Sequence, residues 1–162
     1  MPKKSVKNNN FQNAIISFIL LSIIILGISY HLVYKNNLIG PAFILLGLIN
    51  LVFLKFYKIT ISSVYPDILF GFIDNGILVI MAVIGGSIAG VAGAIIGGAA
   101  GNTITDGIGG LFEGHAAERL RNNKVKETRT ALSSTLGKMA GCLFGAGIGL
   151  LFLSFIKIIL KI

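Results

Sequence analysis

The sequence has few charged residues, one cysteine and two histidines for its length. Of its 162 residues, 12% are charged and 54% hydrophobic, and the mean hydropathy is +0.87, whereas soluble domains are about 25% charged. This shortage of charge excludes an ordinary water-exposed surface and leaves no room for a soluble catalytic domain. Because Cys142 is the only cysteine, an intramolecular disulfide and a cysteine metal cluster are also excluded.

Motifs of catalysis and cofactor binding are missing as well. The glycine runs contain no G-x-x-x-x-G-K-[ST] phosphate loop, and no Ser/His/Asp or Cys/His arrangement is readable. His115 stands two residues from Glu113 and so does not share its helical face. We interpret His115 and His31 as residues of the membrane interface. The sequence therefore predicts a protein that is not an enzyme and binds no organic cofactor.

Long apolar runs dominate the chain, and about 20 such residues cross a hydrocarbon core. They predict an all-α, polytopic integral membrane protein with about five transmembrane helices. We expect these helices over residues 11–33, 39–56, 66–84, 89–120 and 130–156. Residues 57–65 are polar and β-branched, which favours a connector. We divide the chain into a two-helix membrane segment, residues 1–64, and a three-helix core, residues 65–162.

The basic residues indicate topology. The formal charge is +8, but five crossings place ten basic residues on one side and only Lys35, Lys157 and Lys161 on the other. This bias predicts a cytoplasmic amino terminus and argues against nucleic acid as a partner. The first run is too long for a cleaved signal, and the start is too poor in arginine for a mitochondrial transit peptide. We therefore expect a retained first helix in a prokaryotic plasma membrane.

Two glycine ladders have four-residue spacing, which keeps their members close to one helical face. Small faces let helix backbones approach closely in lipid. We expect the fourth and fifth predicted helices to pack through these ladders, within one subunit or between two, in preference to a pore lining. The ladders comprise Gly93, Gly97 and Gly101, and Gly137, Gly141, Gly145 and Gly149.

Polar residues inside the predicted helices are the candidate ion-binding set. A carboxylate at mid-bilayer costs about 2.5–3.5 kcal/mol on insertion scales, and three acidic residues fall there. Spacings of four and eleven put Asn102, Asp106 and Glu113 on one stripe, and Lys138 reaches the same inner half of the membrane. Asp67, in the first predicted turn after Pro66, complements a helix amino terminus. The ion-binding set is Asp74, Asn75, Asn102, Thr105, Asp106 and Glu113, with Asp74, Asp106 and Glu113 as metal ligands and Lys138 as counter-charge.

Two interpretations of this set stay open. In one, Asp74 or Glu113 pairs with Lys138 and only holds helices together. In the other, the carboxylates in excess of that pair bind a cation or a proton. Oxygen-only ligands suit hard ions such as Na⁺ or Ca²⁺.

Residues 66–153 resemble the transmembrane protein 65 family of the mitochondrial inner membrane. The likeness lies in FGFIDN at 70–75, GNTITD at 101–106, Glu113, TLGK at 135–138 and GC at 141–142. The resemblance implies a three-helix core connected with sodium-dependent calcium movement, as the transporter or as its regulator. It covers slightly more than half of the chain and excludes the first two predicted helices.

We therefore expect a membrane cation transporter or exchanger for Na⁺ or Ca²⁺. The alternative is a non-transporting scaffold or regulatory subunit of an ion transporter. The expected partners are the lipid bilayer, the inorganic cation and further copies of the chain, with a homodimer favoured.

Overall fold

A computed structural model describes residues 4–32, 36–122 and 129–160. Its elements are α1 (Lys4–Leu32), α2 (Asn36–Phe56), α3 (Ile61–Asn122) and α4 (Ala131–Leu160), and the described residues contain no strand. Within them, four helices are long and apolar enough to cross a membrane. The prediction of an all-α membrane protein is confirmed at this level.

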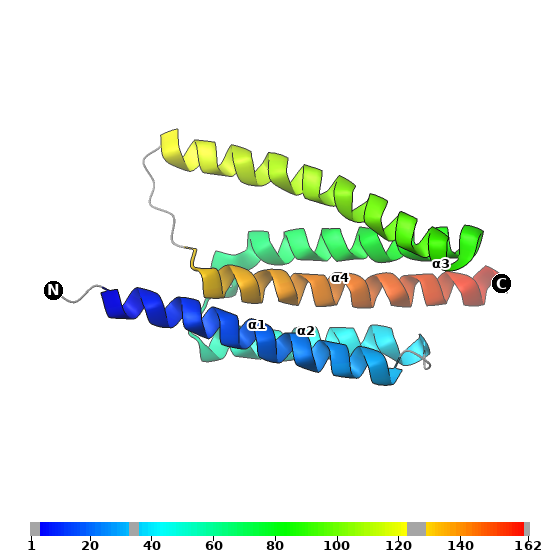
Figure 1. Cartoon of the computed structure of the whole chain (residues 1–162), viewed down its shortest axis with the longest axis horizontal. Helices are drawn as coiled ribbons and strands as arrows, with labels where there is room; N and C mark the ends of the chain where they lie inside the picture. The colour runs from blue at the N-terminus through cyan, green and yellow to red at the C-terminus, as the bar shows by residue number, and fades with distance from the viewer. Residues whose placement is uncertain (1–3, 33–35, 123–128, 161–162) are drawn as a thin grey trace.

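α3 is not one straight helix. Ala89 (φ −135°, ψ 25°) and Gly90 (φ 59°, ψ −141°) have non-helical backbones, and the positive φ at Gly90 suits a residue without a side chain. The chain reverses there, so that residues 61–88, the first arm, lie beside residues 91–122, the second arm (Figure 1). The arms are antiparallel, because Gly97 adjoins Met81 and Gly109 adjoins Phe70.

α4 lies at the centre of the arrangement and packs against α1, α2 and α3 (Figure 1). A buried apolar cluster forms near the start of α4, where all four helices contribute side chains. Its members come from both sides of the division we drew at residue 64, so the two segments share one core. They are Ala14, Leu21, Leu54, Val64, Leu132 and Leu136.

The connection from α2 to α3 is shorter than predicted. α2 ends in a Schellman motif, in which Ile59 N donates to Leu54 O (2.9 Å) and Lys58 N to Lys55 O (3.0 Å). Lys58 takes the positive φ, 56°, that such a cap needs. Only residues 57–60 lie between the helices, so our connector over 57–65 was wrong. Burial explains the difference, because Val64 is 0% exposed and this packing outweighs the weak helix propensity of a β-branched run.

α4 begins with a reciprocal cap. Thr130 Oγ1 accepts from Ser133 N (3.1 Å), and Ser133 Oγ accepts from Thr130 N (2.9 Å), which satisfies two donors as in a capping box. α2 and α3 begin earlier than we expected, at Asn36 and Ile61, so Pro41 and Pro66 lie inside these helices and not in their first turns.

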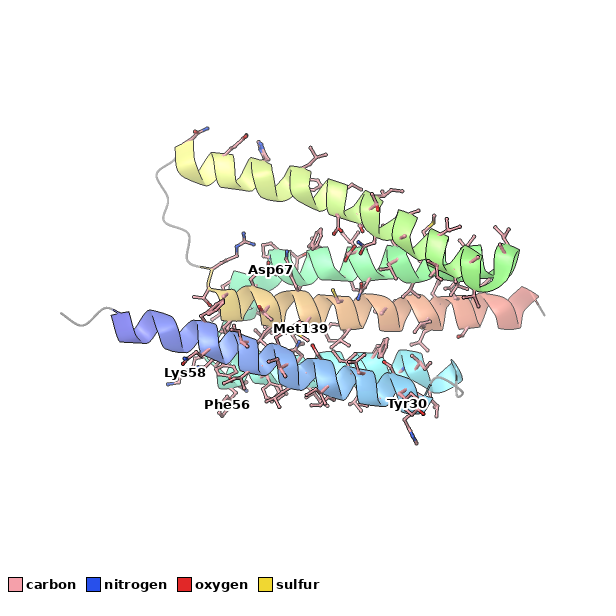
Figure 2. The ribbon with its side chains drawn as sticks, viewed as in Figure 1. Tyr30, Phe56, Lys58, Asp67 and Met139 are labelled. Carbon is pink, nitrogen blue, oxygen red and sulfur yellow. The ribbon has the colours of Figure 1, made fainter. Side chains whose placement is uncertain are left out.

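One end of the bundle holds the start of α1, the end of α2, both ends of α3 and the start of α4 (Figure 1). Lys58 and Phe56 mark this end, and Tyr30 lies at the other (Figure 2). Exposed apolar side chains cover the length between them, as a surface in contact with lipid requires.

Candidate functional site

Asp74 joins the two arms of α3. Its carboxylate accepts a hydrogen bond from Thr105 Oγ1, which also lies 3.1 Å from Gly101 O and 3.0 Å from Asn102 O. Asp74 is 9% exposed and Thr105 is 2% exposed. Among the described residues this hydroxyl is the one hydrogen-bond partner of Asp74, which forms no ion pair. A carboxylate is therefore held inside the bundle by a neutral donor.

Asn75 connects the same region to α4. Its Nδ2 donates to Cys142 O over 3.3 Å, and a Cβ built on Gly71, one turn earlier, would lie 2.9 Å from Cys142 N. The side-chain amide can reach this carbonyl because the two backbones are so close. Asp74, Asn75 and Thr105 thus lie where the two arms and α4 meet.

Asp106 belongs to a different surface. It accepts from Asn102 Nδ2 over 2.8 Å, and the pair is exposed on the second arm. Because successive helical residues are about 100° apart, Thr105 faces the first arm while Asp106 does not. The structure therefore divides the predicted set into Asp74, Asn75 and Thr105 inside and Asn102 with Asp106 outside.

The predicted cluster of the metal ligands Asp74, Asp106 and Glu113 lies partly outside the described residues, because the Glu113 side chain does. Among the described residues, no group of three or more His, Cys, Asp or Glu side chains could hold a metal ion. Glu113 has its backbone in α3.

Lys138 lies over an aromatic ring. Its Nζ is 4.9 Å from the centroid of the Phe70 ring, a cation–π distance. The same ring occupies the space that a Cβ on Gly109 would need, with Cζ 2.7 Å from that position. Lys138 thus contacts the first arm at Phe70, four residues before Asp74.

The predicted glycine ladders both face the first arm. On the second arm, Gly93, Gly97 and Gly101 lie against Gly85, Met81 and Leu78. We expected the second arm and α4 to pack on each other, but the α4 ladder also turns to residues 61–88. The atoms closest to its glycines belong to Val64, Asp67, Ile68, Phe72, Gly76 and Val79.

Asp67 is the residue that sequence reasoning placed wrongly. α3 begins at Ile61, six residues before Asp67, so Asp67 is not in its first turn. Its side chain is 1% exposed, and Oδ1 is 3.2 Å from Arg129 Nη1 and accepts from Ser134 Oγ over 2.9 Å. Oδ2 is buried and has no hydrogen-bond partner among the described residues. Asp67 lies beside α4 (Figure 2), so it ties α3 to the start of α4.

Asn50 was missed altogether. It is 0% exposed in α2, and its Nδ2 donates to Leu136 O over 3.2 Å. The sequence could have indicated this role, because Asn50 is a lone amide in the apolar run 42–54. Polar side chains in membrane helices commonly form hydrogen bonds to neighbouring helices.

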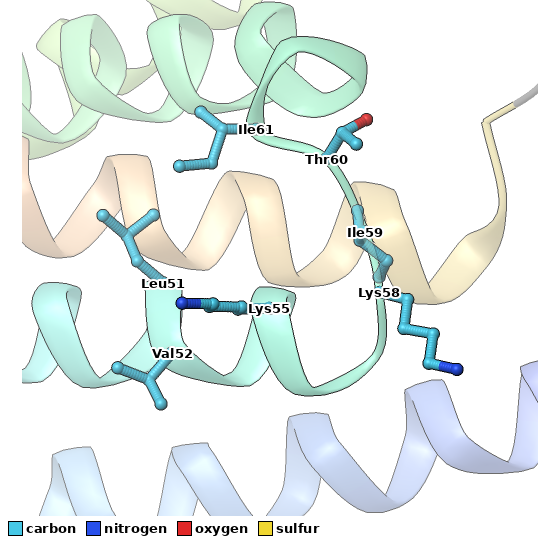
Figure 3. A pocket seen from close by; sticks show the side chains of 7 residues that line it. All are labelled: Leu51, Val52, Lys55, Lys58, Ile59, Thr60 and Ile61. Atoms are coloured by element: carbon cyan, nitrogen blue, oxygen red, sulfur yellow. The ribbon is translucent and has the colours of Figure 1, made fainter.

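A pocket lies at the α2–α3 turn, and none of the predicted site residues lines it (Figure 3). Its lining is mainly apolar and includes two lysines. The lining residues are Leu51, Val52, Lys55, Lys58, Ile59, Thr60 and Ile61.

No protein-family model, curated protein or solved structure matches this chain. The class of protein therefore rests on the fold itself: an all-helical membrane protein with a buried carboxylate between its helices.

Proposed function

We propose that this chain is a membrane cation transporter or exchanger for Na⁺ or Ca²⁺. The observation that carries the proposal is Asp74, 9% exposed and bonded to a hydroxyl. A buried carboxylate needs a proton or a cation to balance it, and an ionisable residue at membrane depth is by default a functional residue. Asn75 follows Asp74 on the first arm, and Thr105 contacts Asp74 from the second arm. The side-chain oxygens of both residues are ligands that hard cations accept.

The path through the membrane would run between the two arms of α3 and α4. Asn102 and Asp106, which we also predicted as ion ligands, lie on the outer surface of the second arm and would not line this path. Lys138 would be the counter-charge that the cation displaces. The glycine ladders support this arrangement because they bring backbone close to backbone around Asp74. The resemblance to the transmembrane protein 65 family falls on these same helices.

A second candidate function is a scaffold or regulatory subunit. It is favoured by the hydrogen bond from Thr105 to Asp74, because a carboxylate that accepts a bond between two arms can have a purely structural role.

The proposal includes five crossings, with each arm of α3 spanning the bilayer and the amino terminus in the cytoplasm. Positive charge near the end that holds Lys55, Lys58 and Arg129 supports this orientation.

We expect cysteines at Lys58 and Ala89 to label from opposite sides of the membrane. Both residues are exposed, and the variants would be made in a Cys142→Ser background with a membrane-impermeant maleimide. Thr60→Cys is the matched control and should label with Lys58→Cys, from the cytoplasmic side. Labelling of Lys58→Cys and Ala89→Cys from one side would exclude five crossings.

We expect Na⁺ or Ca²⁺ to raise the melting temperature of the wild type and not that of Asp74→Asn. A ligand of the folded state stabilises it by RT ln(1 + [L]/Kd), about 2.7 kcal/mol at a hundredfold excess over Kd. Asparagine keeps the shape of aspartate and can still accept from Thr105, but it lacks the charge. Melting would be measured across both ions at constant ionic strength.

Glu118→Gln is the matched control, because it removes one exposed carboxylate from the same helix; its ion response should equal that of the wild type. A wild type without a specific ion response, together with a strongly destabilised Asp74→Asn, would favour the scaffold and exclude the transport proposal.

A further inference from the structure

The second arm of α3 presents a face of mostly small and polar residues away from the bundle. One set of its exposed positions recurs at alternating spacings of four and three, the pattern of a helix seam that packs against another helix. We call this set the outer seam; it comprises Ala92, Ile96, Ala99, Thr103, Asp106 and Gly110.

The outer seam is poorly suited to lipid. Asp106 and Asn102 are bonded to each other at membrane depth, where a carboxylate facing hydrocarbon is costly. Nothing lies within 4 Å of a Cβ built on Gly110, so another helix has room to approach there. The second arm lies at the edge of the bundle, against the first arm (Figure 1). A seam that is both small and charged needs a protein surface to cover it.

We propose that a second copy of this chain covers the outer seam and that the two Asp106 carboxylates together form a cation site. Two copies in one membrane have the same orientation, so their two-fold axis is parallel to the bilayer normal. Residues at one depth then meet the same residues of the other copy. Asp106 would face the Asp106 of the second copy, with an Asn102 amide beside each.

The ligand count favours a second copy over an unrelated partner. Ca²⁺ takes about 6–8 oxygens, and among the described side chains one outer seam offers the Asp106 carboxylate, with the Asn102 amide beside it. No chain-internal cluster of three acidic, histidine or cysteine side chains occurs among the described residues. Two-fold symmetry doubles the set, and two facing carboxylates cannot both stay charged without a cation or a shared proton. The cation part of this inference rests on the proposed function.

Disulfide trapping tests the interface. In a Cys142→Ser background, Ala99→Cys and Thr103→Cys should cross-link into dimers when the membranes are oxidised. Ile104→Cys and Leu111→Cys are matched controls, since both residues are exposed on the second arm, 56% and 75%, outside the outer seam. Cross-linking of the controls in preference to Ala99→Cys and Thr103→Cys would overturn the interface.

Asp106→Asn tests the shared site separately. We expect the variant to cross-link through Thr103→Cys as efficiently as its parent but to lose the rise in melting temperature with Na⁺ or Ca²⁺. If Asp106→Asn keeps the full ion response while Asp74→Asn loses it, the transport proposal stands and the shared site is excluded. If the wild type shows no ion response, the proposed function and the shared site both fail, and only the interface is supported by cross-linking.

Discussion

Gly141→Ala is expected to lower the free energy of unfolding by about 1–3 kcal/mol, the usual cost of overpacking. A Cβ at this position would meet Ile68 O, with Ile68 C at 2.8 Å and Ile68 Cα at 3.0 Å. These are backbone atoms, so no change of rotamer can relieve the contact. α4 would have to move away from the first arm, and the packing around Asp67 and Asn75 would loosen with it.

Gly27→Ala is the matched control. Gly27 lies inside α1 with nothing within 4 Å of a built Cβ, and alanine is the better helix former by about 0.8–1 kcal/mol. Gly27→Ala should therefore equal or exceed the wild type in stability. Both variants would be unfolded by denaturant in the same detergent and followed by circular dichroism. Equal stabilities for the two variants would show that α4 does not depend on close approach at Gly141.

The helices could be predicted because each needs a long apolar run, and such runs are visible in the sequence. The residues at which the helices begin and end could be predicted less accurately. The start of α3 depends on the burial of Val64 among side chains of distant helices, and no local pattern around residues 57–65 reports that burial. The end of α2 depends on a positive φ at Lys58, a conformation more usual for glycine.

The candidate site was predicted by residue type but not by arrangement. Asp74 and Thr105 lie together because the arms of α3 pack at one particular register, which glycines such as Gly97 and Gly101 permit. A shift of one residue would have turned Asp106 inward in place of Thr105. Helical periodicity places Asn102 and Asp106 on one face, as expected, but it cannot say which face meets the first arm.

Asp67 shows the same limit at the other end of the site. Its ion pair joins residues that are far apart in sequence, so an isolated acidic residue after a proline was most simply read as a helix-terminal charge. The tertiary partners Arg129 and Ser134 change that interpretation.

Arg129→Gln is expected to lower the free energy of unfolding more than any other single change at this ion pair. The Asp67 side chain is 1% exposed, whereas that of Arg129 is 35% exposed. Removing the arginine leaves a buried carboxylate without its cation, a change that typically costs about 3–5 kcal/mol. Asp67→Asn should cost less, because the guanidinium of Arg129 can turn to water and the asparagine can still accept from Ser134.

The double variant separates the cost of leaving the Asp67 carboxylate unbalanced from the cost of losing the ion pair itself. In Asp67→Asn with Arg129→Gln, no buried charge remains at this pair, so its stability should exceed that of Arg129→Gln alone. Free energies of unfolding from denaturant titrations in one detergent would give all four corners of the cycle. If Arg129→Gln costs less than Asp67→Asn, the charge on Asp67 is not balanced chiefly by Arg129, and the link between α3 and the start of α4 is made by Ser134 and the packing of Gly137 against Val64.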